Sequence, residues 1–100
     1  MTIPARDIVT DIGDFAFKGC TGLTSVTIIE GVTGIGENAF ADCTGLTTVT
    51  VRCPYYPFLG RNVFENCSAL TSIYVPADSL ESYKTYGWSD YVDLILPIEE

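Results

Sequence analysis

The chain has 100 residues, which is enough for one small domain with a single core. Hydrophobic residues make up 47% of it against a net charge of −8, a balance that excludes intrinsic disorder. The five basic residues are scattered, so no nucleic-acid-binding patch is expected. The longest uncharged stretches, 19–29 and 66–77, are polar and shorter than the roughly 18 apolar residues of a membrane helix. We therefore predict one domain over residues 1–100, without membrane insertion.

The N-terminal residues show no signal peptide, because residues 1–7 lack an apolar segment. Residues 2–4 instead match the close of the repeats that follow them, so the chain is predicted to begin inside a repeat. We expect it to be a fragment of a longer protein. Ile8, Val9 and Ile12 would then rest against a missing coil, and this uncapped end is predicted to be the weak end and to allow end-to-end self-association.

A repeated pattern dominates residues 7–76. The string Ile-Gly-x-x-Ala-Phe at 12–17 recurs at 35–40 and, more loosely, at 59–64. Each copy is followed by a cysteine, a leucine and two alternating β-branched residues, which are Cys20, Leu23, Val26 and Ile28; Cys43, Leu46, Val49 and Val51; and Cys67, Leu70, Ile73 and Val75. The offsets of 23 and 24 residues define repeats at about 7–29, 30–52 and 53–76.

The spacing within one repeat predicts a short strand followed by turns. Val26 and Ile28 alternate with Thr27, so they should point inward from a strand. Ala39 and Phe40 are predicted to lie in about one helical turn, with Phe40 filling the interior. One coil cannot bury its own apolar row, so the three coils must stack to build a continuous core.

The motif I-G-x-x-A-F-x-x-C-x-x-L-x-x-V-x-I resembles the BspA-like class of leucine-rich repeats over nearly the whole chain. The resemblance implies an α+β repeat solenoid, a right-handed coil of about three 23–24-residue repeats with a C-terminal helix-and-strand cap. The third copy departs from the motif at residues 52–60. That stretch resembles the proline-rich variant often found in the final repeat of such arrays.

Residues 77–100 are predicted to form the cap that the last coil of a solenoid needs. Asp78 and Glu81 match a capping box, and a helix should run to Tyr86 and end at a left-handed Gly87. The apolar residues of 88–98 then have a strand-like composition. Trp88 is predicted to close the C-terminal end of the core. The segment also resembles the usual C-terminal cap of BspA-like domains.

The residue types argue against catalysis and against metal or cofactor binding. The chain has no histidine, which excludes Cys-His and Ser-His-Asp mechanisms, and we predict that it is not an enzyme. The four cysteines contain no C-x-x-C pair, so no zinc site is expected. Cys20, Cys43 and Cys67 share one repeat position and are predicted to be buried free thiols, whereas Cys53 is predicted to be exposed.

Two groups of residues form the candidate interaction surface. The first comprises the outward strand positions Ser25, Thr27, Thr48, Thr50, Ser72 and Tyr74. The strand face is the usual binding surface of leucine-rich repeats, although serine and threonine are also simply good strand residues. The second group is Tyr55, Tyr56 and Phe58, whose aromatic composition fits either an interaction site within reach of Tyr74 or packing against the cap near Trp88.

The family resemblance implies a function in molecular recognition. We expect a non-catalytic protein- or glycan-interaction module of adhesion type in a secreted or surface-attached bacterial protein, with an extracellular or cell-surface location. Its partner would be a host or bacterial surface protein or glycan, and no cofactor is expected. Two alternatives stay open: a structural spacer without its own ligand, and an accessory domain beside an enzyme.

Overall fold

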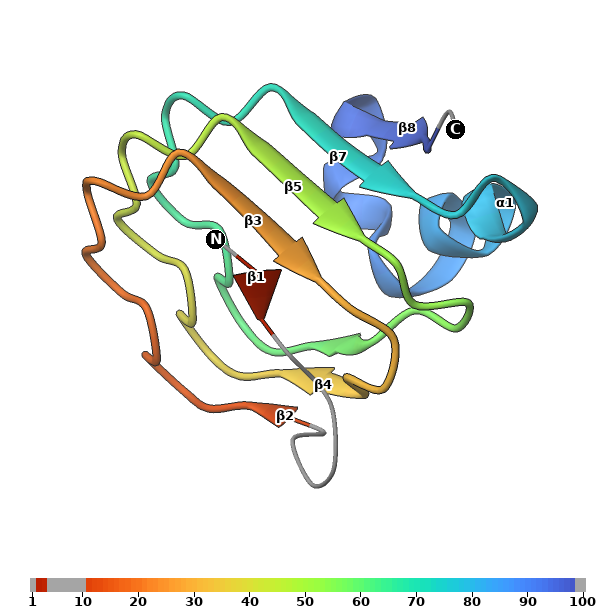
Figure 1. Cartoon of the computed structure of the whole chain (residues 1–100), viewed down its shortest axis with the longest axis horizontal. Helices are drawn as coiled ribbons and strands as arrows, with labels where there is room; N and C mark the ends of the chain where they lie inside the picture. Colours follow the sequence, from red (N-terminus) through yellow and green to blue (C-terminus); the bar gives the residue numbers. More distant parts are fainter. Residues whose placement is uncertain (1, 4–10, 99–100) are drawn as a thin grey trace.

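Two parallel sheets organise the chain in a computed structural model, which describes residues 2–3 and 11–98 (Figure 1). The larger sheet contains, in spatial order, β1 (Thr2–Ile3), β3 (Ser25–Ile28), β5 (Thr48–Val51), β7 (Ser72–Val75) and β8 (Ile95–Pro97). The smaller sheet contains β2 (Asp11–Ile12), β4 (Gly34–Ile35) and β6 (Phe58–Leu59). Neighbouring strands come from successive repeats, so the chain winds through a first coil (11–28), a second coil (34–51) and a third coil (58–75).

The strand register brings equivalent repeat residues side by side. Val26 pairs with Val49, Val49 with Ile73 and Ile73 with Ile95, and all four side chains are buried. The predicted inward rows are therefore confirmed. Strand β1 pairs Thr2 with Thr27 and Ile3 with Ile28, so it occupies the place of a preceding repeat strand, as expected for residues 2–4.

A third side of each coil consists of tight turns rather than the predicted helical turn at Ala39–Phe40. The N–H groups of Ala39, Ala41 and Cys43 each donate to a carbonyl three residues earlier, at 3.1–3.3 Å. Asn38 and Asp42 have φ angles of 55° and 60°, which break any helix here. Phe40 nevertheless fills the interior, stacked between Phe17 and Phe64 with centroid distances of 5.3 and 5.7 Å.

Backbone hydrogen bonds lock the turn side of one coil to the next. The N–H groups of Phe15, Phe17 and Gly19 donate to the carbonyls of Glu37, Ala39 and Ala41 at 2.7–2.8 Å. The same three bonds recur one coil later, from Asn38, Phe40 and Asp42 to Arg61, Val63 and Glu65. Each coil thus offers donors to the following coil and acceptors to the preceding one.

Each coil has two turn residues in the left-handed conformation, and Phe15 is an unusual residue type at one of these positions. Asn38 and Asn62 hold the equivalent position at φ 55° and 54°, whereas Phe15 holds it at φ 60°. Asparagine tolerates this conformation far better than a bulky residue.

Phe15→Asn is expected to raise the free energy of unfolding by about 1 kcal/mol. The phenyl ring is 52% exposed, so little burial is lost. Urea denaturation would measure the change, with Phe15→Ala as the control that removes the ring without supplying an asparagine. An asparagine variant that is no more stable than the alanine variant would contradict backbone strain at Phe15.

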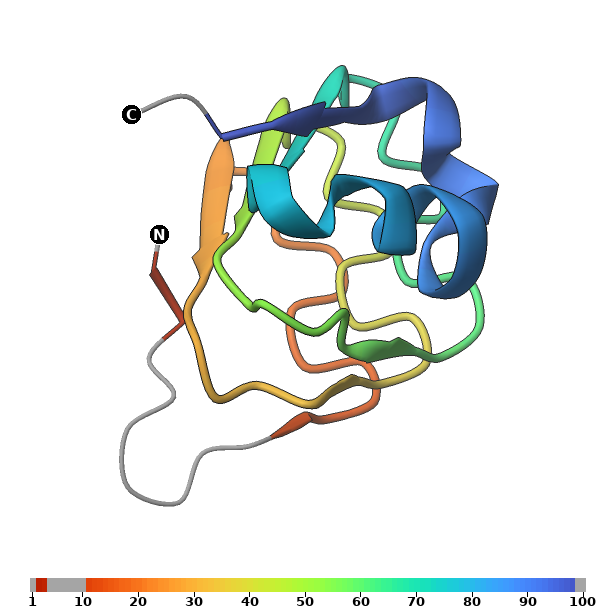
Figure 2. The same ribbon diagram turned by 90° about the vertical axis from the view of Figure 1, so that its right-hand side faces the viewer.

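The C-terminal cap covers the open end of the third coil (Figure 2). It runs through a 3-10 turn (Ala77–Ser79), α1 (Leu80–Ser82), a π-helical turn (Tyr83–Gly87) and a second 3-10 segment (Ser89–Leu94) before β8. The predicted helix-and-strand cap is present, but the strand-like tail is a strand only at Ile95–Pro97. Trp88 is fully buried, as predicted.

The predicted signals at the two ends of the cap helix are wrong. Asp78 lies inside the 3-10 turn that follows Pro76 and makes no side-chain capping bond. Gly87 is not left-handed, since Gly19 and Gly31 are the described glycines with positive φ. Glycine is needed at 87 for a different reason: a β-carbon there would collide with the Tyr56 ring.

The predictions for two of the four cysteines, Cys20 and Cys53, are also wrong. Cys43 is buried, with its thiol 3.2 Å from the Phe17 carbonyl of the preceding coil, and Cys67 is half-buried with its thiol 3.1 Å from the Phe40 carbonyl. Cys20 is exposed, because no described coil precedes it. Cys53 is buried rather than exposed, with its thiol 3.4 Å from the Ile29 carbonyl.

One fast-reacting thiol, that of Cys20, is expected in the native protein at pH 8. Burial raises the pKa of Cys43 and Cys53 above the usual value, and it raises the pKa of Cys67 to about 11. Titration with a thiol reagent should find four thiols after denaturation, and Cys20→Ser should abolish the fast phase. Rapid modification of Cys53 would contradict its burial beneath the cap.

Candidate functional site

The outward side of β3, β5 and β7 carries regular rows of hydroxyl side chains. Ser25, Thr48 and Ser72 align in one row, and Thr27, Thr50 and Tyr74 align in the next. None of the six residues is buried. On β8, Leu96 continues the second row beside Tyr74 and is itself exposed. We call the six residues of β3, β5 and β7, without Leu96, the hydroxyl face.

The three aromatic residues of the second group have different surroundings in the structure. Tyr55 is 88% exposed. Tyr56 packs on the cap, with its ring centroid 6.0 Å from that of Tyr83 and 6.5 Å from that of Tyr86. Phe58 lies in β6 of the smaller sheet and pairs with Gly34, so it belongs to a different sheet from Tyr74. Packing against the cap is therefore the role of Tyr56.

The backbone of residues 53–57 anchors the cap, a role that sequence reasoning missed. Tyr83 Oη donates to the Cys53 carbonyl at 2.6 Å, and Ser79 Oγ donates to the Pro54 carbonyl at 2.6 Å. Trp88 Nε1 donates to the Pro57 carbonyl at 2.9 Å. The departure of the third repeat from the motif was the available signal, because on its C-terminal side this segment meets the cap where earlier repeats meet a following coil.

Tyr83→Phe is expected to lower the free energy of unfolding by about 1–3 kcal/mol. The substitution leaves the Cys53 carbonyl buried without its hydroxyl donor, and burial already holds the pKa of Tyr83 well above its usual value. Chemical denaturation would measure the loss. Tyr86→Phe is a matched control, because Tyr86 is 67% exposed; equal effects in the two variants would contradict the role of this bond.

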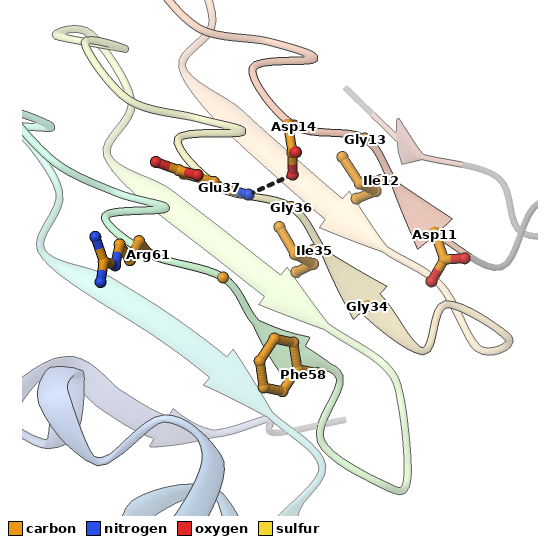
Figure 3. A pocket seen from close by; sticks show the side chains of 11 residues that line it. Asp11, Ile12, Gly13, Asp14, Gly34, Ile35, Gly36, Glu37, Phe58 and Arg61 are labelled. Carbon is orange, nitrogen blue, oxygen red and sulfur yellow. Dashed lines mark hydrogen bonds between the residues drawn. The ribbon is translucent and has the colours of Figure 1, made fainter.

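A shallow hollow of about 670 Å³ lies over the smaller sheet (Figure 3). Its lining includes the glycines at the shared repeat position, which are Gly13, Gly36 and Gly60. Asp11 and Phe58 flank it on β2 and β6, while Asp14, Glu37 and Arg61 line the neighbouring row. Asp14 Oδ1 accepts a hydrogen bond from the Glu37 N–H at 2.8 Å. The hollow offers carboxylates and an exposed phenyl ring to a ligand.

The described residues offer neither a metal site nor a membrane-spanning helix. Residues 2–3 and 11–98 contain no cluster of three or more side chains that could hold a metal ion. Within these ranges, no helix has both the length and the apolar character to cross a bilayer.

Parallel coils that stack a buried row of leucine, valine and isoleucine define a leucine-rich repeat protein. A sequence profile described as "BspA type Leucine rich repeat region (6 copies)" matches residues 1–94, and the chain belongs to this family. The family prediction made from the repeat motif is confirmed.

One similar solved structure is a leucine-rich repeat protein from Bacteroides ovatus ATCC 8483. It is 25% identical over 90% of this chain, with a TM-score of 0.46, and the chain spans 28% of that protein. No curated protein matches the sequence.

Proposed function

We propose that this chain is a non-catalytic interaction module of a secreted or surface-attached bacterial protein, and that it binds a protein or a glycan of a host or bacterial surface. Membership of the BspA type family supports a repeat module of this kind. A right-handed coil with repeats of 23–24 residues belongs to the same proposal. The pairing of Ser25 with Thr48 and of Thr48 with Ser72 supports the repeat lengths.

The observation that carries the proposal is the hydroxyl face. Its small side chains are aligned and partly or fully accessible, and Tyr74 adds one large side chain beside exposed Leu96. Tyrosine combines a large contact area with one polar group, which suits recognition of proteins and sugars. A face built on three four-residue strands is small for a protein interface, which typically buries roughly 800 Å² per partner, so we expect binding by this chain alone to be weak.

A structural spacer is the second candidate, and a specific observation favours it. The hydroxyls of Thr47 and Thr71 donate to the carbonyls of Thr24 and Thr47 in the preceding coils, at 3.0 and 3.3 Å. Some hydroxyl side chains on these coils therefore serve stacking. The spacer would need no ligand.

A binding screen against matrix proteins and a glycan array distinguishes the two candidates. The parent chain and a Tyr74→Ser variant are compared for every ligand detected, and we expect the variant to lose binding by at least about tenfold. Tyr86→Ser is the matched control, since it removes an exposed tyrosine from the cap. Phe58→Ser reports on the hollow over the smaller sheet.

Unchanged binding by Tyr74→Ser would overturn the assignment to the hydroxyl face. Loss of binding in Phe58→Ser alone would move the site to the hollow. The absence of any ligand, for the chain presented in many copies on a surface to compensate for weak affinity, would overturn the interaction proposal in favour of the spacer.

A further inference from the structure

The outward row of the smaller sheet places a glycine between an acidic and an aromatic residue. The register pairs Asp11 with Gly34 and Gly34 with Phe58 across β2, β4 and β6. Neighbouring strands lie about 4.8 Å apart, so roughly 10 Å separates the backbones of Asp11 and Phe58. Because Gly34 has no side chain, a slot lies between the Asp11 carboxylate and the Phe58 ring, within the hollow over this sheet (Figure 3).

The second residue of each strand faces the core and fixes the outward direction of the first. Ile12 and Ile35 are buried, and Leu59 is half-buried. The exposed apolar area predicted at Ile12 is therefore absent, while Ile8 and Val9 lie outside the described residues. Since side chains alternate along a strand, the residues that precede them point to solvent.

The Asp11 carboxylate leans over Gly34 and leaves the rest of the slot open. A β-carbon on Gly34 would lie 2.9 Å from Asp11 Oδ1, and it would meet no described atom of another residue within 4 Å. Thr33 Oγ1 donates to the same carboxylate oxygen at 3.5 Å. A carboxylate has about four acceptor positions, so Asp11 can also accept hydrogen bonds from a ligand.

The charge around the slot is negative. Asp14 and Glu37 add two carboxylates along the neighbouring row, where Asp14 Oδ1 accepts the Glu37 N–H at 2.8 Å. Arg61 also lines the hollow, but Figure 3 shows it at the opposite side from Asp11. The described residues contain no cluster that could hold a metal ion, which favours an organic cation as the ligand.

We propose that the slot formed by Asp11, Gly34 and Phe58 binds an arginine side chain of a partner protein. A guanidinium is planar, so it can pair its N–H groups with the Asp11 carboxylate while its face stacks on the Phe58 ring. The ring is 73% exposed and is therefore accessible to a partner. This site lies on the other sheet from the hydroxyl face and is a second, independent surface.

Two other ligands fit the slot less well. A neutral sugar could stack on Phe58 and donate to the carboxylates, but it would not use the excess of negative charge. A second copy of the chain carries the same net charge of −8, so electrostatic repulsion opposes its approach. A basic segment of another protein has the complementary charge.

A nuclear magnetic resonance titration tests the proposal with a peptide probe. The labelled chain is titrated with acetyl-Gly-Gly-Arg-Gly-Gly-amide and, as the matched control, with the same peptide carrying citrulline, which keeps the shape of arginine without its charge. We expect the arginine peptide to shift the amide signals of Asp11, Gly34 and Phe58. The citrulline peptide should bind at least about tenfold more weakly.

Substitutions in the slot identify the groups that hold the arginine. Asp11→Asn removes the charge and Phe58→Leu removes the aromatic face, and each should weaken binding of the arginine peptide by at least about threefold. Both residues are exposed, so the variants should fold like the parent. Glu81→Gln is the matched control, since it removes one negative charge at an exposed residue of the cap and should leave binding unchanged.

Several results would overturn the assignment. They are equal binding of the citrulline peptide, unchanged binding by Asp11→Asn or Phe58→Leu, and the absence of shifts in the slot at about 10 mM arginine peptide. Shifts confined to the hydroxyl face would overturn it as well, while leaving the interaction function of that face standing. Binding of the neutral trisaccharide cellotriose that Phe58→Leu abolishes would assign the slot to a sugar. A parent dimer that Phe58→Leu dissociates would assign it to a second copy.

Discussion

Trp88→Ala is expected to unfold much of the domain. The indole is fully buried, its centroid lies 5.5 Å from that of Tyr83 and 6.0 Å from that of Phe64, and its N–H donates to the Pro57 carbonyl at 2.9 Å. Truncating a buried aromatic costs about 3–5 kcal/mol, against a total stability of about 5–15 kcal/mol for a natural domain. The remaining stability should be small or absent.

Thermal unfolding followed by circular dichroism measures this effect. Tyr86→Ala is the control, since it removes an exposed aromatic from the same cap. Trp88→Phe should fall between the two, because it keeps part of the packing and loses the bond to Pro57. If Trp88→Ala melts within a few degrees of the parent, the indole does not close the core.

Phe40→Ala is expected to cost about 3–5 kcal/mol as well. Phe40 is the middle ring of the stack, fully buried between Phe17 and Phe64 with interplanar angles of 5° and 12°. Its loss would leave a cavity between the first and third coils. The backbone hydrogen bonds that join the three coils would prevent the neighbouring side chains from closing this cavity fully.

Urea denaturation of Phe40→Ala beside Phe17→Ala tests the stacking directly. Phe17 is half-buried at the exposed side of the first coil, so its truncation should cost clearly less. Equal losses in the two variants would contradict the position of Phe40 at the centre of the core.

The repeat pattern predicted most of the core because stacking places equivalent residues in equivalent surroundings. Val26, Val49 and Ile73 share one row, and the alternation of apolar and polar residues in each repeat was sufficient to predict that they point inward. The burial of Trp88 was predictable too, because the last coil exposes an apolar surface that a cap must cover.

The remaining differences arise where a residue lacks the surroundings of its repeat equivalents. Cys20 occupies the same repeat position as Cys43, but no described coil precedes it, so it is exposed. Cys53 follows a strand like any loop residue, yet the cap folds over it through Tyr83. Gly87 looked like a helix terminator, but it is required by contact with Tyr56, 31 residues away in sequence.

The outward direction of the strand residues in the candidate surface could be predicted from the sequence, whereas the positions of the aromatic residues in 53–58 could not. Alternation along β5 and β7 places Thr48, Thr50, Ser72 and Tyr74 on the outside in any parallel sheet. The route of residues 53–58 depends on where the cap lies, and composition alone gave no means to separate Tyr56 on the cap from Phe58 on the smaller sheet.

Nuclear Overhauser effects in a labelled sample test the register of the stacked coils most directly. We predict cross-strand contacts that link Val26 to Val49 and Val49 to Ile73, with ring contacts from Phe17 to Phe40 and from Phe40 to Phe64. Contacts that instead join β3 and β5 in an antiparallel order, or that place Phe40 away from both other rings, would contradict the stacked coils.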